Sequence, residues 1–360
     1  MMGNRNDFRD RRGREHAWVS DGTRVLRSGG PPEFAIMVPP MSSPASVSVQ
    51  DLVHDYGERR VLRGLDFTVP EGEIFGLLGP NGGGKTTLFR ILATLLRPTG
   101  GRALVMGRDA AREPGEVRRC IGVVFQSPAL DRVLTVRENL HVHGRLYGLT
   151  GRGLRGAEEE MLRRVRLLDR ADDRVGTLSG GLMRRAEIAK GLLHRPRLLL
   201  MDEPSSGLDP GARQDLWDLL RDLRGHDGTT VLLTTHLMEE AERCDRLAIL
   251  SDGTLVAAGT PRQLKAEIGG DVIVISAAAP EEIRQGIETR FGGPVQVVDG
   301  SVRLERPSGH ELIPRLVEAF ADRIDSVTLG RPTLLDVFIH RTGHRFLGDD
   351  GPAPPAGRAS

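Results

Sequence analysis

Apolar residues along the chain fall into short runs and helical repeats, which predict strands and helices in turn. Apolar positions at helical spacing predict a helix over Lys85–Leu96, and a second helix is expected from Gly180 to about Leu193. In the first helix these positions are Leu88, Ile91, Leu92 and Leu95. The runs with strand character are Glu73–Leu78, Ile121–Phe125, Leu198–Met201 and Thr230–Thr234.

A different order of elements follows a predicted hairpin at Ser251–Gly253. Two of its strands are joined by Asp299-Gly300, a dipeptide typical of hairpin turns. The order β-α-β-β-α-β is that of a split βαβ, or ferredoxin-like, unit. This unit shows no catalytic set of residues, so we interpret it as a dimer-stabilising or regulatory appendage. Its expected strands are Asp271–Ser276, Val295–Val298, Val302–Glu305 and Ser326–Leu329, and its expected helices cover Pro280–Phe291 and Leu312–Phe320.

Length and composition limit what the chain can be. Its 360 residues give room for two domains and disordered ends. The hydrophobic content of 39% predicts a soluble globular protein, and a formal net charge of +1 gives no overall attraction to nucleic acid or to an anionic membrane. Cys120 and Cys244 lie far apart without metal-binding spacing, which indicates a reducing compartment and two core residues. No apolar stretch approaches the ~18 residues that a membrane helix needs.

The two ends of the chain differ in composition from the rest. The first 30 residues hold seven arginines and lack an apolar central region, so this is not a secretory signal. Two interpretations stay open for residues 1–45: a disordered N-terminal extension, or translation that begins at Met41. Residues 344–360 are predicted to form a flexible tail.

One short run carries the strongest chemical signal. It reads GPNGGGKTT and fits the phosphate-loop pattern G-x-x-x-x-G-K-[ST], between a predicted strand and a predicted helix as the motif requires. The glycines let backbone N–H groups approach a polyphosphate, Lys85 can reach the β- and γ-phosphates, and Thr86 can ligate Mg²⁺. A glycine-rich turn that ends in Lys-Thr by chance is the alternative, which the flanking strand and helix disfavour. The residues expected to bind nucleotide here are Gly79, Pro80, Asn81, Gly82, Gly83, Gly84, Lys85, Thr86 and Thr87.

A second run, further along, reads LSGGLMRRAEIAKGLLHRPRLLLMDEPSSGLD. Ser179 suits a helix N-cap, and Gly180 and Gly181 leave backbone amides uncovered, as at an anion site. Asp202 and Glu203 end a predicted strand. There one carboxylate can hold Mg²⁺ and the adjacent one can orient an attacking water.

Together these motifs resemble the ATP-binding cassette (ABC) family over roughly residues 46–270. The resemblance implies an α/β fold: a P-loop NTPase cassette with a RecA-like α/β core, a helical subdomain and an antiparallel β subdomain, followed by a small α+β C-terminal domain at 271–343. Leu182–Arg185 and the stretch RPTLLDVFIHRTGH are further similar to the daunorubicin-type drug-resistance exporters. The chain departs from the family at Leu182, where Gln is preferred. The matching motifs are Tyr56, the phosphate loop, Gln126, the LSGG signature, Asp202-Glu203, the run ending at Asp209, and His236.

The resemblance also implies a role for each matching residue. Glu203 is the expected general base, and Lys85, Gln126 and His236 act with it on the γ-phosphate and the attacking water. Mg²⁺ is expected on Thr86, Gln126 and Asp202. Tyr56 would stack on adenine, with an ordinary strand-end tyrosine as the alternative, and a core histidine is the alternative for His236. Ser179 and Gly181 would contact the γ-phosphate of a second subunit's nucleotide, and Asp209 would lie at the dimer interface. Gly180 and Asp209 are counted with them among the nucleotide-binding residues.

A single phosphate loop and a single signature imply a homodimer around two ATP. The resemblance implies an ATP-hydrolysing subunit at the cytoplasmic face of the cell membrane. It would drive a separate integral membrane permease that exports a drug, antibiotic or other hydrophobic compound. Ser127–Tyr147, with a capping box at Thr135 and Glu138, is the candidate permease contact, and a plain helical insertion is the alternative. Two other functions stay open: a soluble ABC ATPase acting on ribosomes or DNA, and a scaffold that binds nucleotide without hydrolysis.

Overall fold

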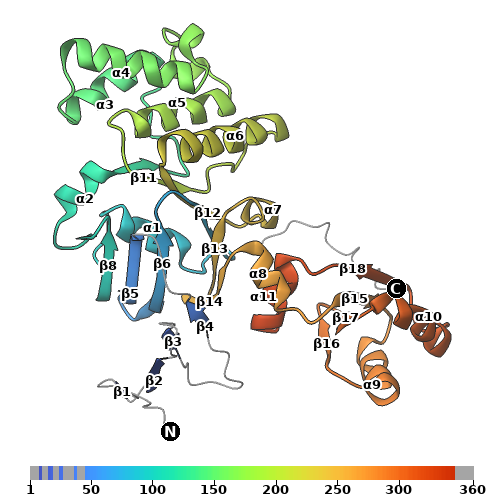
Figure 1. The fold of residues 1–360 in the computed structure, drawn as a ribbon. Coiled ribbons are helices and arrows are strands. Elements are labelled where there is room, and N and C mark those ends of the chain that lie inside the picture. The colour runs from blue at the N-terminus through green and yellow to red at the C-terminus, as the bar shows by residue number, and fades with distance from the viewer. Residues whose placement is uncertain (1–7, 10–14, 19–23, 27–35, 39–44, 345–360) are drawn as a thin grey trace.

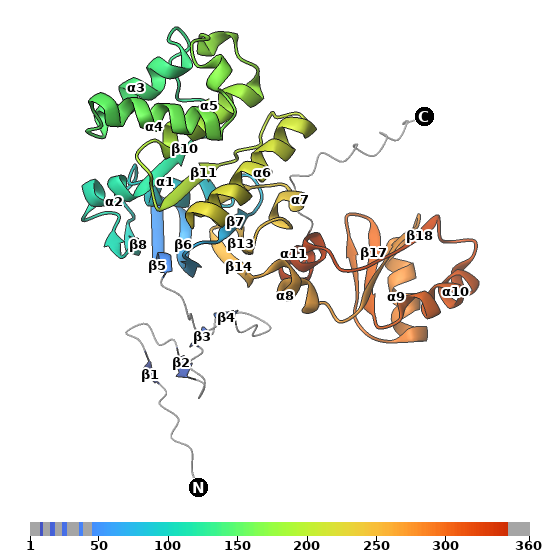
Figure 2. The same cartoon turned by 45° about the horizontal axis from the view of Figure 1, so that its top comes forward.

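The computed structural model describes residues 8–9, 15–18, 24–26, 36–38 and 45–344. A central, mostly parallel sheet lies between an antiparallel sheet and a layer of helices, and a C-terminal unit extends to one side (Figure 1). Figure 2 shows the same parts from a second direction, with the C-terminal unit again set apart from the helical layer. None of the helices in the described part of the chain combines the length and the apolar character needed to cross a membrane.

The central sheet has the strand order β10-β11-β12-β7-β13-β14 and is parallel except for β14. Side chains alternate between its faces, so Leu199 and Met201 pack under the helical layer while Leu198 and Leu200 face the antiparallel sheet. Both faces are covered, which explains why β7, β11 and β12 are buried throughout. The strands are β7 (Ile74–Leu78), β10 (Ile121–Val124), β11 (Leu198–Asp202), β12 (Thr230–Thr235), β13 (Arg246–Ser251) and β14 (Thr254–Gly259). The helices beside them are α1 (Lys85–Leu92), α2 (Pro114–Cys120), α6 (Pro210–Asp227), α7 (Met238–Ala241) and α8 (Pro261–Ala266).

The antiparallel sheet has the order β6-β5-β8-β9. Its apolar side chains form one core cluster with α1 and one face of the central sheet. Together they cover the helix that follows the phosphate loop. The strands are β5 (Ala45–Tyr56), β6 (Arg59–Pro70), β8 (Gly100–Val105) and β9 (Arg108–Asp109).

The helical layer packs over the other face of the central sheet. The predicted capping box is confirmed: Thr135 Oγ1 accepts from the Glu138 N–H at 3.1 Å, and Glu138 Oε2 accepts from the Thr135 N–H at 2.8 Å. Ser179 is also confirmed as an N-cap, since its hydroxyl accepts from the Leu182 N–H at 3.4 Å. The elements are α3 (Val136–Leu146), α4 (Gly151–Arg164), α5 (Gly180–Leu192) and the short 3₁₀ turns Leu168–Arg170 and Val175–Thr177.

The C-terminal unit has the predicted β-α-β-β-α-β order. Its sheet runs β16-β17-β15-β18 with every neighbouring pair antiparallel, which is the ferredoxin-like arrangement. The predicted turn is present at Asp299 and Gly300, with φ of 49° and 74°, as a two-residue hairpin requires. The elements are β15 (Asp271–Ser276), α9 (Pro280–Phe291), β16 (Val295–Val298), β17 (Ser301–Arg306), α10 (Gly309–Phe320) and β18 (Ser326–Gly330).

The last helix, α11 (Leu334–Thr342), returns from this unit to the cassette. Its residues Leu334, Val337 and Phe338 form one buried cluster with residues of β13, β14, α7 and α8 and with Val272 of β15. The helix therefore belongs to the core of both parts, although the sequence places it in the C-terminal domain alone.

Some predicted boundaries differ from the structure. The helix α1 ends at Leu92 rather than Leu96, because Thr94 adopts a positive φ of 62° and Leu95 is exposed. Cys244 is buried as expected, whereas Cys120 is half-buried.

Within residues 1–45, predicted to lack structure, four short strands pair in the order β1-β2-β3-β4. Ala45 begins β5. The other residues of that segment and residues 345–360 lie outside the described residues, so their predicted disorder stays a prediction. The short strands are β1 (Phe8–Arg9), β2 (Glu15–Trp18), β3 (Arg24–Leu26) and β4 (Ile36–Val38).

Candidate functional site

The phosphate-loop run joins the carboxyl end of β7 to the start of α1. At Gly84, the residue before the helix, φ is 100°, and a Cβ there would lie 2.8 Å from Leu62 Cδ2. At Gly79 a Cβ would lie 2.4 Å from the Leu250 carbonyl oxygen. Only glycine fits these two positions, so the loop stays close to β6 and β13.

Lys85 is buried at the base of this loop, with its side chain 4% exposed. Its Nζ donates to the carbonyl oxygens of Gly79 at 2.7 Å and Pro80 at 3.0 Å, and it lies 4.0 Å from Glu203 Oε1. Burial lowers the pKa of Lys85, while the Glu203 and Asp202 carboxylates counteract this. The ammonium is therefore held by loop carbonyls in a position from which it can turn to a phosphate.

A hollow of about 390 Å³ opens above the loop. The structure brings the predicted nucleotide residues of the loop together here with Tyr56, at the end of β5, and Glu203, at the end of β11. Tyr56 is 44% exposed, so its ring is accessible from the hollow. Sequence reasoning missed Arg59, Val61 and Arg90, whose place on this wall follows from the packing of β6 and α1. The predicted residues that line the hollow are Tyr56, Asn81, Gly82, Gly84, Lys85, Thr86, Thr87 and Glu203.

The two carboxylates at the end of β11 are held by β12. Thr234 Oγ1 donates to Asp202 Oδ1 at 2.6 Å and accepts from the Glu203 N–H at 2.9 Å. Burial raises the pKa of Asp202; the Thr234 hydrogen bond lowers it, the Glu203 charge raises it, and Lys85 and Arg90 lower it. Thr234 was not predicted as a site residue, because in the sequence it appears only as part of a strand.

Glu203 is flanked by Gln126 and His236, two of the other predicted catalytic side chains. Gln126 Nε2 donates to Glu203 Oε2 at 3.1 Å, and His236 Nδ1 lies 3.3 Å from Glu203 Oε1. His236 Nδ1 is buried, and its contact with Glu203 lacks hydrogen-bond geometry. The structure therefore gathers Lys85, Gln126, Asp202, Glu203 and His236 around one point.

These groups fit a magnesium nucleotide. Among the described residues, no three His, Cys, Asp or Glu side chains gather as a metal cage. Mg²⁺ commonly takes one or two carboxylates and completes its shell with substrate phosphates and water. Asp202, with Thr86 at the start of α1, suits that mode of binding.

The signature residues lie elsewhere. Ser179 caps α5 and Asp209 caps α6, where its Oδ1 accepts from the Ala212 N–H at 2.9 Å. A Cβ on Gly181 would lie 2.9 Å from the Ala212 Cβ, so the two helix starts are adjacent. Ser179, Gly180 and Asp209 are exposed. The structure thus brings the signature and Asp209 together, but outside the hollow that holds Lys85.

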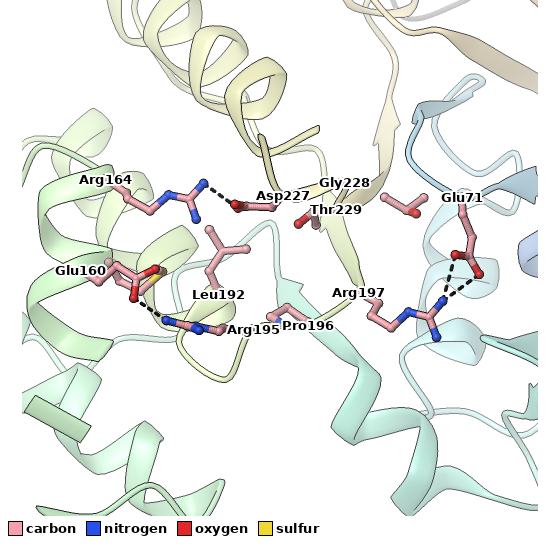
Figure 3. Close-up of a pocket in the computed structure, with 12 residues that line it drawn as sticks. Glu71, Glu160, Arg164, Leu192, Arg195, Pro196, Arg197, Asp227, Gly228 and Thr229 are labelled. Carbon is pink, nitrogen blue, oxygen red and sulfur yellow. Dashed lines mark hydrogen bonds and ion pairs between the residues drawn. The ribbon is translucent and has the colours of Figure 1, made fainter. Parts of the chain in front are cut away.

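A second hollow of about 390 Å³ lies at the amino ends of the parallel strands. The phosphate loop lies at the opposite, carboxyl ends of these strands. Three arginines line it, and each already pairs with a carboxylate (Figure 3). The pairs are Arg164 with Asp227 at 2.6 Å, Arg195 with Glu160 at 2.6 Å, and Arg197 with Glu71 at 2.9 Å. Its charges are balanced internally, so the hollow offers an anion no unpaired arginine among its lining residues.

Comparison with known proteins places this geometry in a family. Residues 62–206 match the family described as "ABC transporter", and residues 183–242 also match one described as "AAA domain, putative AbiEii toxin, Type IV TA system". The chain is 41% identical to daunorubicin resistance ATP-binding protein DrrA2 of Streptomyces coeruleorubidus, over 83% of this chain and 96% of the relative. It is 44% identical to Nod factor export ATP-binding protein I of Burkholderia pseudomallei (strain K96243), over 85% of this chain and 99% of the relative.

Solved structures agree with this placement. The chain is similar to cbiO1 of Clostridium perfringens, part of the ABC transporter complex cbiONQ, with a TM-score of 0.58 and 26% identity over 69% of this chain and 96% of that chain. It is similar to the ATP-binding cassette MJ0796, solved as a post-hydrolysis dimer bound to ADP and Pi, with a TM-score of 0.54 and 28% identity over 59% of this chain and 98% of that chain. With the nucleotide hollow and the ordered motifs, these likenesses show that the chain belongs to the ABC transporter family and is a transport ATPase.

Proposed function

We propose that two copies of this chain close around two ATP, each copy completing the site of the other. The observation that carries the proposal is the separation of the site into two parts on one chain. Lys85 and Glu203 line the hollow, whereas Ser179, Gly180 and Asp209 are exposed at adjacent helix starts outside it. Helix N-termini with free amides bind anions, so a second copy can present its signature to the γ-phosphate. The dimeric form of MJ0796 supports this arrangement.

The residues in and beside the hollow divide the chemistry among them. Lys85 exchanges its loop carbonyl partners for the β- and γ-phosphates, and the ring of Tyr56 stacks on the adenine. Glu203 takes the proton of the water that attacks the γ-phosphorus as the bond to the β-phosphate oxygen breaks. Gln126 and His236, which lie against the two Glu203 oxygens, orient that water and the phosphate. Most of the catalysis is positioning and neutralisation of charge, as phosphoryl transfer requires.

Mg²⁺ would be held by Asp202, Thr86 and Gln126. When bound, it neutralises phosphate charge. The buried Thr234 hydroxyl keeps Asp202 turned toward that position.

We propose further that the dimer drives a separate integral membrane permease from the cytoplasmic face of the membrane. Four of the eight exposed large apolar side chains among the described residues lie in Ser127–Tyr147, on α3 and the loop before it. Exposed apolar side chains on the segment that follows Gln126 suit a membrane partner. The relatives named for daunorubicin resistance and Nod factor export support export, here of a drug, antibiotic or other hydrophobic compound. The four side chains are Val133, Val142, Leu146 and Tyr147.

The dimer is tested with Glu203→Gln, which removes the base but keeps the shape of the side chain. Loss of a general base lowers kcat by about 100-fold or more, so ATP stays bound and the closed dimer accumulates. Light scattering with MgATP should then show twice the mass that it shows without nucleotide.

Two control variants make this result specific. Ser179→Ala in the Glu203→Gln background should lower the fraction of dimer, because the signature cap loses its hydroxyl. Lys85→Ala should abolish tight ATP binding. A Glu203→Gln protein that stays monomeric with saturating MgATP, or that hydrolyses ATP at the wild-type rate, would refute the proposal.

A further inference from the structure

Three charged side chains of α5 bind the backbone of the loop after β10. Arg184, Glu187 and Lys190 are spaced by three residues and so lie along one face of the helix. Arg184 donates from Nη1 to the Phe125 carbonyl oxygen at 2.6 Å and from Nη2 to the Gln126 carbonyl oxygen at 3.2 Å.

The other two side chains bind the loop at Ala129. Glu187 Oε1 accepts from the Ala129 N–H at 2.6 Å, and Lys190 Nζ donates to the Ala129 carbonyl oxygen at 2.6 Å. All of these bonds reach main-chain atoms, so they fix the path of residues 125–129 whatever their side chains do.

Arg184 and Glu187 form a buried ion pair. Their charged atoms lie 3.0 Å apart, and the side chains are 6% and 2% exposed. A buried pair of this kind adds little net stability, because desolvation offsets the attraction, but it imposes one geometry. Here that geometry is the position of the Gln126 loop on α5.

This loop lies between two parts of the proposed catalytic machinery, Glu203 and the helix α5. At one end Gln126 Nε2 donates to Glu203 Oε2. On its other side the loop is bound to α5. This helix begins with the signature glycines that the proposed function assigns to the nucleotide of the second subunit. We propose that Arg184, with Glu187, is a positioning residue that ties Gln126 to α5. The two bonds from Arg184 to the loop carbonyls then hold Gln126 where its Nε2 meets Glu203 Oε2. This inference rests on the proposed roles of Gln126 and Glu203.

The test uses the full-length chain with Arg184→Gln and Glu187→Gln combined. The double substitution removes both charges at once, so neither is left buried and unpaired. We expect kcat to fall by about 10- to 100-fold, as for a misplaced catalytic group. KM for ATP should stay near the wild-type value, because Lys85 and the glycine loop are untouched. Arg185→Gln is the matched control: Arg185 lies on the same helix but pairs with Asp215 of α6, and its kcat should be unchanged.

The decisive step repeats the double substitution in a Gln126→Ala background. If Arg184 acts through Gln126, the further loss of kcat disappears there, since coupled residues are not additive. The same fold-loss in both backgrounds overturns the inference, because it shows a general structural role. Wild-type kcat in Gln126→Ala alone refutes the assignment of Gln126, and the inference with it. Wild-type kcat in the double variant refutes the inference alone.

If the double variant does not fold, Arg184→Lys replaces it in the same comparison. Lysine keeps a charge beside Glu187 but lacks the planar fork that reaches two carbonyl oxygens. Its loss of kcat must likewise vanish in the Gln126→Ala background. No loss, or an equal loss in both backgrounds, overturns the inference.

Discussion

At the scale of single residues, Glu203 has an unusual backbone conformation, and a neighbouring side chain holds it in place. It is a non-glycine residue with a φ of 43°, in the left-handed region that side chains rarely adopt. The Thr234 hydroxyl accepts its N–H and at the same time donates to Asp202. One fully buried threonine therefore holds the proposed base and the proposed metal ligand in fixed relation.

Thr234→Val should reduce activity more than it reduces ATP binding. Valine fills the same space but leaves the Glu203 N–H without its acceptor, at a cost of about 1–3 kcal/mol of unfolding free energy. We expect kcat to fall while the affinity for ATP changes little, measured by steady-state hydrolysis and by nucleotide titration.

Thr234→Ser provides the control for this variant, because it keeps the hydroxyl and loses only a methyl group. Its kcat should stay close to that of the wild type. If the valine variant hydrolysed ATP as fast as the serine variant, the hydroxyl would have no part in positioning Glu203.

Residues with a local motif could be predicted from the sequence, whereas residues that act across the fold could not. Lys85 and Asp202 are recognisable because their neighbours in the chain, a glycine loop and a strand end, define their chemistry. Thr234 and Arg184 contact partners that lie 31 and 58 positions away in the sequence, respectively. No spacing along the chain reports such a contact.

At the scale of elements, α3 and α5 are joined at their ends by a ring cluster. The rings of Tyr147 and His194 stack with centroids 3.8 Å apart, and His143 lies 4.9 Å from Tyr147. Burial lowers the pKa of His143 to about 4, and the nearby charges of Lys190 and His194 act in the same direction. The pKa of His194 is also lowered by burial.

The lowered pKa of His143 predicts a loss of stability in acid. The folded protein keeps this ring neutral down to a pH of about 4, whereas the unfolded chain takes up a proton below the ordinary value of 6.5. Its contribution is therefore complete above pH 6.5 and is lost as the pH falls from 6.5 toward 4. His143→Gln should lessen the decrease in Tm between pH 7 and about pH 5, measured by thermal unfolding.

Val142→Ala is the control, because this side chain does not titrate and is 52% exposed on α3. Its Tm should follow the wild-type pH dependence. If His143→Gln followed it as well, the burial of His143 would not contribute to acid sensitivity.

Boundaries of elements were predictable where a cap or a glycine turn defines them. The capping box at Thr135 and the hairpin at Asp299-Gly300 are such cases, since each rests on hydrogen bonds or dihedral angles within a few residues. The end of α1 was not predictable, because apolar spacing continues to Leu95. Packing decides there: Leu92 is buried and Leu95 is not.

At the scale of the whole molecule, α11 joins the cassette to the C-terminal unit. Phe338 is fully buried in a cluster that includes Leu78, the residue directly before the phosphate loop, and Val272 of the C-terminal sheet. Arg303 of β17 and Asp336 of α11 form an ion pair beside this cluster. The two parts therefore share a core rather than a linker alone.

Phe338→Ala should weaken this connection. Truncation of a buried phenylalanine costs about 3–5 kcal/mol of unfolding free energy. We expect calorimetry to show two separate transitions in place of one, of which only the cassette transition rises with added ADP.

The matching control is Val317→Ala, on α10, where the side chain is 45% exposed. It should leave a single transition near the wild-type Tm. A single, unshifted transition in Phe338→Ala would show that α11 does not hold the two parts together.

The sequence by itself determined the cassette, the phosphate loop, the order of motifs and the ferredoxin-like pattern of the C-terminal unit. These features depend on short-range rules: glycines where backbone must come close, caps at helix starts, and apolar spacing that repeats with the element. The tertiary structure decided which strand ends meet, and so brought Thr234 to Asp202 and Glu203 and Arg184 to the Gln126 loop. It also decided that α11 packs against the cassette, because burial in a shared core depends on the folded arrangement of segments distant in the chain.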